Sequence, residues 1–196
     1  MMHDPNLINK GAVTMHLHQA TEKERQLIFN IILDGKQQLS DAGIDQWQTE
    51  YPKMSVIDQD IAKGQAFIFD SEDHETVGTA AIIKAPDEAY DAMTGEWSDT
   101  TAQYMSIHRV AIYSHHKGKG YASRLFEALF NYIEQHHPEI TSIRIDTHQD
   151  NDKMQYLIKK VGFEEVGKMH GFYHPNDVSY VYEKLIGAKI KVASTN

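Results

Sequence analysis

One stretch of this sequence decides the fold, and it reads Val110-Ala111-Ile112-Tyr113-Ser114-His115-His116-Lys117-Gly118-Lys119-Gly120-Tyr121-Ala122. It starts as an apolar strand, passes through a loop of lysines and glycines, and leads into a segment with helical apolar spacing. A helix N-terminus attracts anions because its first N–H groups are unpaired and partially positive. Gly118 and Gly120 let the backbone approach a phosphate without a Cβ atom in the way. The stretch therefore predicts a phosphate or diphosphate cradle, and a glycine turn with solvated lysines is the open alternative.

Two familiar nucleotide-binding motifs do not fit this loop. A Walker loop continues from its last glycine into Lys-Ser or Lys-Thr, whereas Tyr121 and Ala122 follow Gly120 here. The dinucleotide fingerprint has a third glycine three residues after the second, and Ser123 occupies that position. These mismatches argue against a P-loop ATPase and against a Rossmann dehydrogenase.

Outward from this loop, the sequence alternates between strand and helix patterns. Apolar or alternating runs predict strands over 13–18, 65–69, 76–84, 102–113, 140–147, 163–169 and 178–185. Helical spacing predicts helices over 21–39, 55–63, 120–136 and 151–161. Two pairs with the spacing of helix caps, Thr21 with Glu24 and Ser55 with Asp58, stand at the first two helix starts.

This order of elements predicts a single α/β domain over residues 13–190, preceded by a flexible N-terminal arm over residues 1–12. We expect a mixed sheet of about six to seven strands flanked by about four helices. Each of the last two helices should form a crossover between parallel strands.

Composition narrows the classes of function. The chain has 196 residues, 41% of them hydrophobic and 24% charged, which suits one domain with a real core. It has no cysteine, which excludes disulfides, thiolate zinc sites and cysteine nucleophiles and fits the cytoplasm. A formal net charge of −9 argues against general nucleic-acid binding. The sequence has neither a secretory signal nor an apolar run of roughly 20 residues, so we expect no membrane partner.

With these elements in place, the chain resembles the GNAT superfamily of N-acetyltransferases. The family's central motif is an apolar strand, then Gln or Arg, two variable residues, Gly, one variable residue, and Gly or Ala. Gly118 and Gly120 match it, and His115 stands where Gln or Arg is usual. A second motif, an Asn followed by a helix and a Gly-Phe pair, matches Asn151 and 162–163. The segment 43–52 resembles that of a bacterial subgroup of these enzymes whose substrate is not defined.

The resemblance implies acetyl-coenzyme A as co-substrate, bound where two central parallel strands splay apart. The pantetheine arm would pair with the backbone of one strand and the diphosphate with the loop. The implied cofactor-binding residues are Val110, Ala111, Ile112, His115, Lys117, Gly118, Lys119, Gly120, Tyr121, Ala122 and Asn151. An acceptor amine would attack the thioester directly, so no cysteine is needed.

The resemblance leaves the acid and the base open. The family's usual acid is a tyrosine seven residues after the motif's Asn, and that position is Ile158. Tyr156 lies about 200° around the helix from it and should face elsewhere. His108 is a candidate base because its ordinary pKa is near neutrality, with a structural histidine as the alternative. Glu96 precedes the central strand and could reach an amine through water.

Aromatic residues mark a candidate acceptor site. Trp47 and Tyr51 lie in the connection that often covers this site in the family, either stacking on the acceptor or plugging the core. We expect no metal, because the adjacent pairs such as His115-His116 should have diverging side chains.

The sequence thus supports acetyl transfer to a primary amine of a small molecule or peptide. The alternatives are a non-catalytic coenzyme A-binding sensor or interaction module, and a binder of another phosphate ligand. Either a monomer or a homodimer fits the pattern, and the acceptor is not defined.

Overall fold

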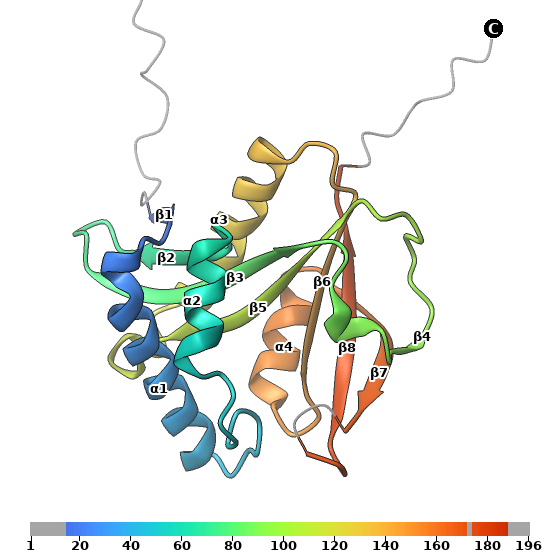
Figure 1. The fold of residues 1–196 in the computed structure, drawn as a ribbon, viewed down its shortest axis with the longest axis horizontal. Coiled ribbons are helices and arrows are strands. Elements are labelled where there is room, and N and C mark those ends of the chain that lie inside the picture. The colour runs from blue at the N-terminus through green and yellow to red at the C-terminus, as the bar shows by residue number, and fades with distance from the viewer. Residues whose placement is uncertain (1–14, 172–173, 188–196) are drawn as a thin grey trace, which may run out of the picture.

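The computed structural model describes residues 15–171 and 174–187. The predicted N-terminal arm and the first two residues of the first predicted strand lie outside the described residues. Over these residues, eight strands form one sheet: β1 (His16–Gln19), β2 (Ala66–Asp70), β3 (Thr76–Lys84), β4 (Thr94–Gly95), β5 (Tyr104–Ile112), β6 (Ser142–His148), β7 (Glu164–His170) and β8 (Val178–Leu185). Their order is β1-β2-β3-β5-β6-β8-β7-β4, and β5 and β6 are the parallel pair (Figure 1).

The single mixed α/β sheet is confirmed, with one strand more than the six to seven predicted. The additional strand is β4, which pairs with the edge of β7 over two positions, Thr94 with Lys168 and Gly95 with Gly167. A strand of two residues is too short to show the alternation of apolar and polar residues that marks a strand, so the sequence pattern assigned this segment to a long connection.

In the part of the chain that the structure describes, four α-helices pack on the sheet: α1 (Arg25–Asp41), α2 (Met54–Ala62), α3 (Tyr121–His136) and α4 (Asp152–Lys160). Three 3₁₀ turns accompany them: η1 (Glu22–Glu24), η2 (Glu88–Tyr90) and η3 (Ser114–His116). The predicted cap of Thr21 and Glu24 is present at η1, where the Thr21 N–H donates to Glu24 Oε2 at 2.8 Å. The predicted Ser55 and Asp58 cap is wrong, because α2 starts earlier and Asp58 accepts hydrogen bonds from Arg25 instead.

The alternation of side chains along β2 divides the core into two layers. Ala66 and Ile68 pack with α1 and α2 on one face. Phe67 and Phe69 join the cluster of α3 and α4 side chains on the other face. Ile31 of α1 and Leu129 of α3 are completely buried, and burying each side chain contributes about 1.5–3 kcal/mol. Both faces of the sheet are therefore covered, and a ligand must enter from an edge or through a gap.

The sheet has such a gap between β5 and β6. The two strands pair over only three positions, Tyr104 with Ser142, Met105 with Ile143 and Ser106 with Arg144. Beyond them β5 runs diagonally away from β6 (Figure 1). The predicted splay of the central parallel strands is confirmed, and it leaves the second half of β5 without a partner on its β6 side.

Within the residues described, no helix has both the length and the apolarity needed to cross a bilayer.

Candidate active site

A cavity of about 350 Å³ occupies the gap between the splayed strands. Its walls come from β5, the end of β6, the starts of α3 and α4, and the connection between α1 and α2. Most of the residues proposed from sequence line it: Trp47, Tyr51, His108, Val110, Ala111, Ile112, Lys117, Gly118, Gly120, Tyr121, Ala122 and Asn151. Residues from five separate segments thus converge on one space.

Three other predicted residues do not line this cavity. His115 is half exposed on the outer side of η3, and Lys119 is exposed at the tip of the loop. Glu96 is exposed at the β4–β7 edge, where its N–H donates to Val166 O at 3.2 Å. The structure therefore does not bring Glu96 to His108.

The loop before α3 has the form of an anion cradle. Gly118 and Gly120 both have φ of +79°, the left-handed region that favours glycine. No atom lies within 4 Å of where a Cβ would stand on either residue, so the space above the loop is open. Gly120 is the N-cap of α3, and no side chain caps that helix start. The first N–H groups of α3 therefore face the cavity as ready donors for a diphosphate.

A bulge on β5 shapes the strand beside this cradle. Thr79 pairs with Ala111, and Ala81 pairs with His108, so β5 has one more residue than β3 between these pairs. Arg109 sits in the bulge with φ of +53°. Such a bulge bends the strand and redirects its main-chain groups.

Side chains on the α2 side hold the bulge in place. The Arg109 guanidinium donates from Nη2 to Asp60 Oδ1 at 2.9 Å and from Nη1 to the Tyr51 hydroxyl at 3.0 Å, and its Nε lies 2.6 Å from Asp60 Oδ2 in the same ion pair. A bidentate ion pair of this kind fixes orientation as well as charge. The strained backbone at Arg109 is thus supported on the face of the sheet that α1 and α2 cover.

His108 forms a hydrogen-bonded pair with an aspartate that sequence reasoning did not select. Its Nε2 lies 2.6 Å from Asp87 Oδ2, and its Nδ1 lies 4.0 Å from Asp146 Oδ1. Asp87 comes from the long connection after β3, and Asp146 is on β6. Both His108 and Asp146 line the cavity. The splay thus holds an imidazole between two carboxyl groups.

The two carboxyl groups differ in pKa. Burial acts to raise the pKa of Asp87, but the hydrogen bond with His108 and the charge of that ring outweigh it, so the pKa is below its ordinary value. Burial raises the pKa of Asp146, against a smaller opposing effect of His108. Asp146 Oδ2 is buried without a hydrogen-bond partner among the described residues. Asp87 is thus the anionic member of the pair, and Asp146 is the one suited to hold a proton.

Two further residues explain how the α1–α2 connection joins the site. Gln46 Oε1 accepts hydrogen bonds from Asn151 Nδ2 at 2.8 Å and from Thr147 Oγ1 at 3.3 Å. Asn151 Oδ1 in turn accepts from the Met154 N–H and caps α4. Trp47 is 6% exposed and packs beside Ala111, so it forms a wall of the cavity rather than an exposed platform.

A sequence signal existed for one of the missed groups. Asp146 stands within the largely buried strand β6, where an acidic residue is unusual. Asp87 and Gln46 lie in connections, where only the folded chain reveals their partners. In α4, Ile158 is fully buried and Tyr156 is 69% exposed, as the helical offset predicted.

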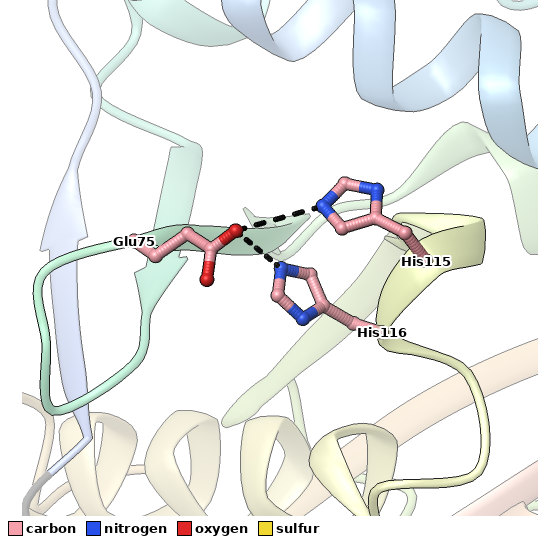
Figure 2. Close-up of side chains that lie close together, drawn as sticks. All are labelled: Glu75, His115 and His116. Atoms are coloured by element: carbon pink, nitrogen blue, oxygen red, sulfur yellow. Dashed lines mark ion pairs between the residues drawn. The ribbon is translucent and has the colours of Figure 1, made fainter.

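The adjacent histidines of η3 correct another prediction. The rings of His115 and His116 lie 4.2 Å apart, and both approach Glu75 (Figure 2). The prediction that their side chains diverge is wrong, because η3 is a tight turn rather than a strand or helix interior. Burial, then the charge of His115, lowers the pKa of His116.

A sheet opened at one parallel pair, with an uncapped helix start at the mouth of the gap, defines the class of acyl-coenzyme A-dependent transferases. The chain belongs to the acetyltransferase (GNAT) family, whose profile matches residues 29–163. It is a GNAT N-acetyltransferase, enzyme class EC 2.3.1.-. The family implies an acetyl acceptor and a fold that binds acetyl-coenzyme A.

Three relatives illustrate the likeness. The uncharacterized N-acetyltransferase YesJ of Bacillus subtilis (strain 168) is 26% identical over 172 residues, which covers 87% of this chain and 89% of YesJ. A GNAT acetyltransferase from Streptococcus agalactiae 2603 is 32% identical, with a TM-score of 0.76 over 88% of this chain and 95% of that one. Spermidine N-acetyltransferase from Vibrio cholerae, solved with CoA and spermine, is 15% identical, with a TM-score of 0.64 over 87% and 95% of the two chains.

Proposed function

We propose that the enzyme transfers the acetyl group of acetyl-coenzyme A to a primary amine of a small molecule or peptide, by direct attack. The observation that carries this proposal is the single cavity that joins the glycine cradle to His108 through the splay. A cradle at one end and a titratable pair at the other match a long ligand with a diphosphate and a reactive thioester.

Each part of the cofactor has a matching part of the cavity. Within the loop from about Lys117 to Ala122, the N–H groups of the two glycines and of the start of α3 would hold the diphosphate, because those of Lys117 and Lys119 donate to Ser114 O and His116 O. The Lys117 side chain would add positive charge at the cavity wall. The unpaired side of β5 at Val110–Ile112 would bind the pantetheine amides in the way a neighbouring strand would. Asn151 acts indirectly, because its side chain caps α4 and binds Gln46.

His108 is the proposed general base. With the proton of the neutral ring on Nε2, donated to Asp87, the lone pair is on Nδ1 beside Asp146. The amine nitrogen forms the new C–N bond as the C–S bond breaks, and Nδ1 takes the proton the amine loses. Main-chain N–H groups of β5 past the bulge are the proposed donors to the oxyanion.

The leaving thiolate also needs a proton. Ile158 cannot donate one, and the hydroxyl of Tyr156 is on the outer face of α4. We therefore assign the thiolate's proton to water at the open mouth of the cavity. The fully buried Ile158 in the family's tyrosine position is also the observation that favours the second candidate, a non-catalytic coenzyme A-binding module.

The charge of the site suits an amine acceptor. Asp87 and Asp146 flank His108 within a chain of net charge −9. The Asp87 carboxylate at the reacting end, together with the negative charge of the chain, favours an approaching ammonium group and disfavours an anionic acceptor.

Thiol release in the presence of a panel of primary amines tests the proposal. The enzyme should release free coenzyme A faster with an acceptor than without, and calorimetry should detect coenzyme A binding in both cases. Binding with no acceptor-dependent release from any amine would instead support the non-catalytic module. If coenzyme A fails to bind at all, both the proposed acetyl transfer and the non-catalytic coenzyme A-binding module are ruled out.

A further inference from the structure

Glu75, His115 and His116 form a cluster outside the proposed reaction path. Glu75 lies in the turn between β2 and β3, and the two histidines lie in η3, between β5 and the glycine loop (Figure 2). Glu75 Oε1 is 3.8 Å from His115 Nε2 and 3.5 Å from His116 Nε2. The three ligand atoms lie within 4.8 Å of one another.

His116 supplies an independent observation that this cluster takes a ligand. Its side chain is only 3% exposed. Neither of its ring nitrogens has a hydrogen-bond partner of acceptable geometry among the described residues, although a weak hydrogen bond with the Thr76 backbone acts to raise the pKa of the ring. A buried, unpaired polar group costs about 1–3 kcal/mol. An ion that accepts the lone pair of Nε2 would relieve that cost.

The spacing suits a transition metal. Tetrahedral Zn²⁺ with nitrogen and oxygen ligands at about 2.0–2.2 Å separates the ligand atoms by about 3.3–3.6 Å. The two distances from Glu75 Oε1 match this separation within a few tenths of an ångström. His115 and Glu75 are more than half exposed, so their side chains can close on an ion and water can take the fourth position.

The geometry points to a three-residue binding site for Zn²⁺, with Glu75, His115 and His116 as protein ligands. Imidazole favours Zn²⁺, Cu²⁺ or Ni²⁺ over Mg²⁺ and Ca²⁺, which prefer oxygen ligands. The bound ion would join the β2–β3 turn to η3, the segment that leads into the glycine cradle. His116 also lines the cavity of the proposed function, but the proposed acetyl transfer uses none of the three ligands, so either proposal can fail without the other.

Calorimetry with Zn²⁺ alone tests this site on the full chain, without an affinity tag and after removal of metals. One ion should bind per chain. The variants H115A and E75Q should bind about tenfold more weakly or worse, because each removes one of three ligands from an exposed position. Both should keep the wild-type fold, which circular dichroism checks.

Two matched variants control for the many other histidines and acids. E72Q changes an exposed carboxylate of the same turn, and H16A removes an exposed histidine that stacks on His74. Both should keep wild-type affinity, and the Co²⁺-loaded protein should show the visible absorption of a four-coordinate ion. The proposal is overturned if wild-type protein binds no Zn²⁺, if H115A and E75Q bind as wild type does, or if H16A alone loses binding.

Discussion

The side chain of His108, on β5, makes one short hydrogen bond to Asp87, and its second ring nitrogen faces Asp146. That arrangement could not be read from the sequence, because the three residues lie on β5, the long connection and β6. A histidine on a strand is as often structural as catalytic. The observation that gives His108 a catalytic role to test is that its side chain lines the cavity.

Replacing His108 by alanine should lower kcat by about 10²-fold or more, since general-base catalysis contributes 10²–10⁴-fold. Affinity for coenzyme A should remain, because the glycine cradle lies at the other end of the cavity. Steady-state kinetics and calorimetry check the two parts. His136→Ala is the matched control, an exposed histidine that bonds only within α3. Wild-type kcat in H108A would rule out the assigned base.

Asp146 predicts an unusual pH dependence of stability. Its folded-state pKa is raised by burial, so folding favours its protonated form, and wild-type stability falls as pH rises through that pKa. The D146N variant has no carboxyl group at this position, so its stability should not fall with pH for this reason. Its free energy of unfolding, relative to wild type, should therefore increase from pH 4 to pH 8 in denaturant titrations.

The same titration on Asp73→Asn, an exposed carboxylate in the β2–β3 turn, should show no such increase. His108, Asp87 and Arg109 also act on Asp146, so the measurement reports the whole buried set. A difference between D146N and wild type that shrinks with pH would mean that the Asp146 carboxylate is stabilised by the fold.

At the scale of elements, the glycine loop and the start of α3 were predictable because local chemistry sets them. Left-handed φ at Gly118 and Gly120 follows from the residue type, and helical spacing starts directly after them. The wrong cap at α2 has a physical reason as well. Arg25 of α1 binds Asp58, and this tertiary ion pair overrode a local capping pattern.

Alanine at Gly120 tests the cradle. A left-handed non-glycine residue costs about 1–2 kcal/mol, and its Cβ would occupy the open space above the loop. Coenzyme A affinity should fall about tenfold or more. Gly64→Ala is the control, since Gly64 has φ of +64° but ends α2 away from the cavity. Calorimetry should give G64A wild-type affinity and both variants reduced stability. Equal affinity in the two would contradict the cradle.

At the scale of the molecule, the order of strands and helices followed from the sequence, and the convergence of distant residues did not. The structure shows that the sheet is covered on both faces, with Phe67 and Ile68 of β2 in different core clusters. The contact of Gln46 with Asn151 spans 105 positions and joins a connection to α4. No local pattern encodes such a pair, because it depends on how α1 and α4 pack on opposite faces.

The whole chain should respond differently to coenzyme A and to ADP. A ligand at about 100 times its Kd raises the free energy of unfolding by about 2.7 kcal/mol. ADP shares the diphosphate but lacks the pantetheine arm, so at the same concentration its effect should be smaller. Thermal unfolding with each nucleotide measures this. Equal shifts would mean that the splayed half of β5 binds nothing.

In the described part of the chain, a ladder of three residue pairs joins the strands on one side of the gap, β1-β2-β3-β5, to those on the other, β6-β8-β7-β4. Apart from the two-position pairing of the edge strand β4, this is the shortest ladder of the sheet, so we expect a pulling force or denaturant to separate the sheet there first. A cofactor that spans the gap would hold the two parts of the sheet together. Release of the cofactor after each turnover would briefly return the enzyme to the form in which the two parts of the sheet separate most easily.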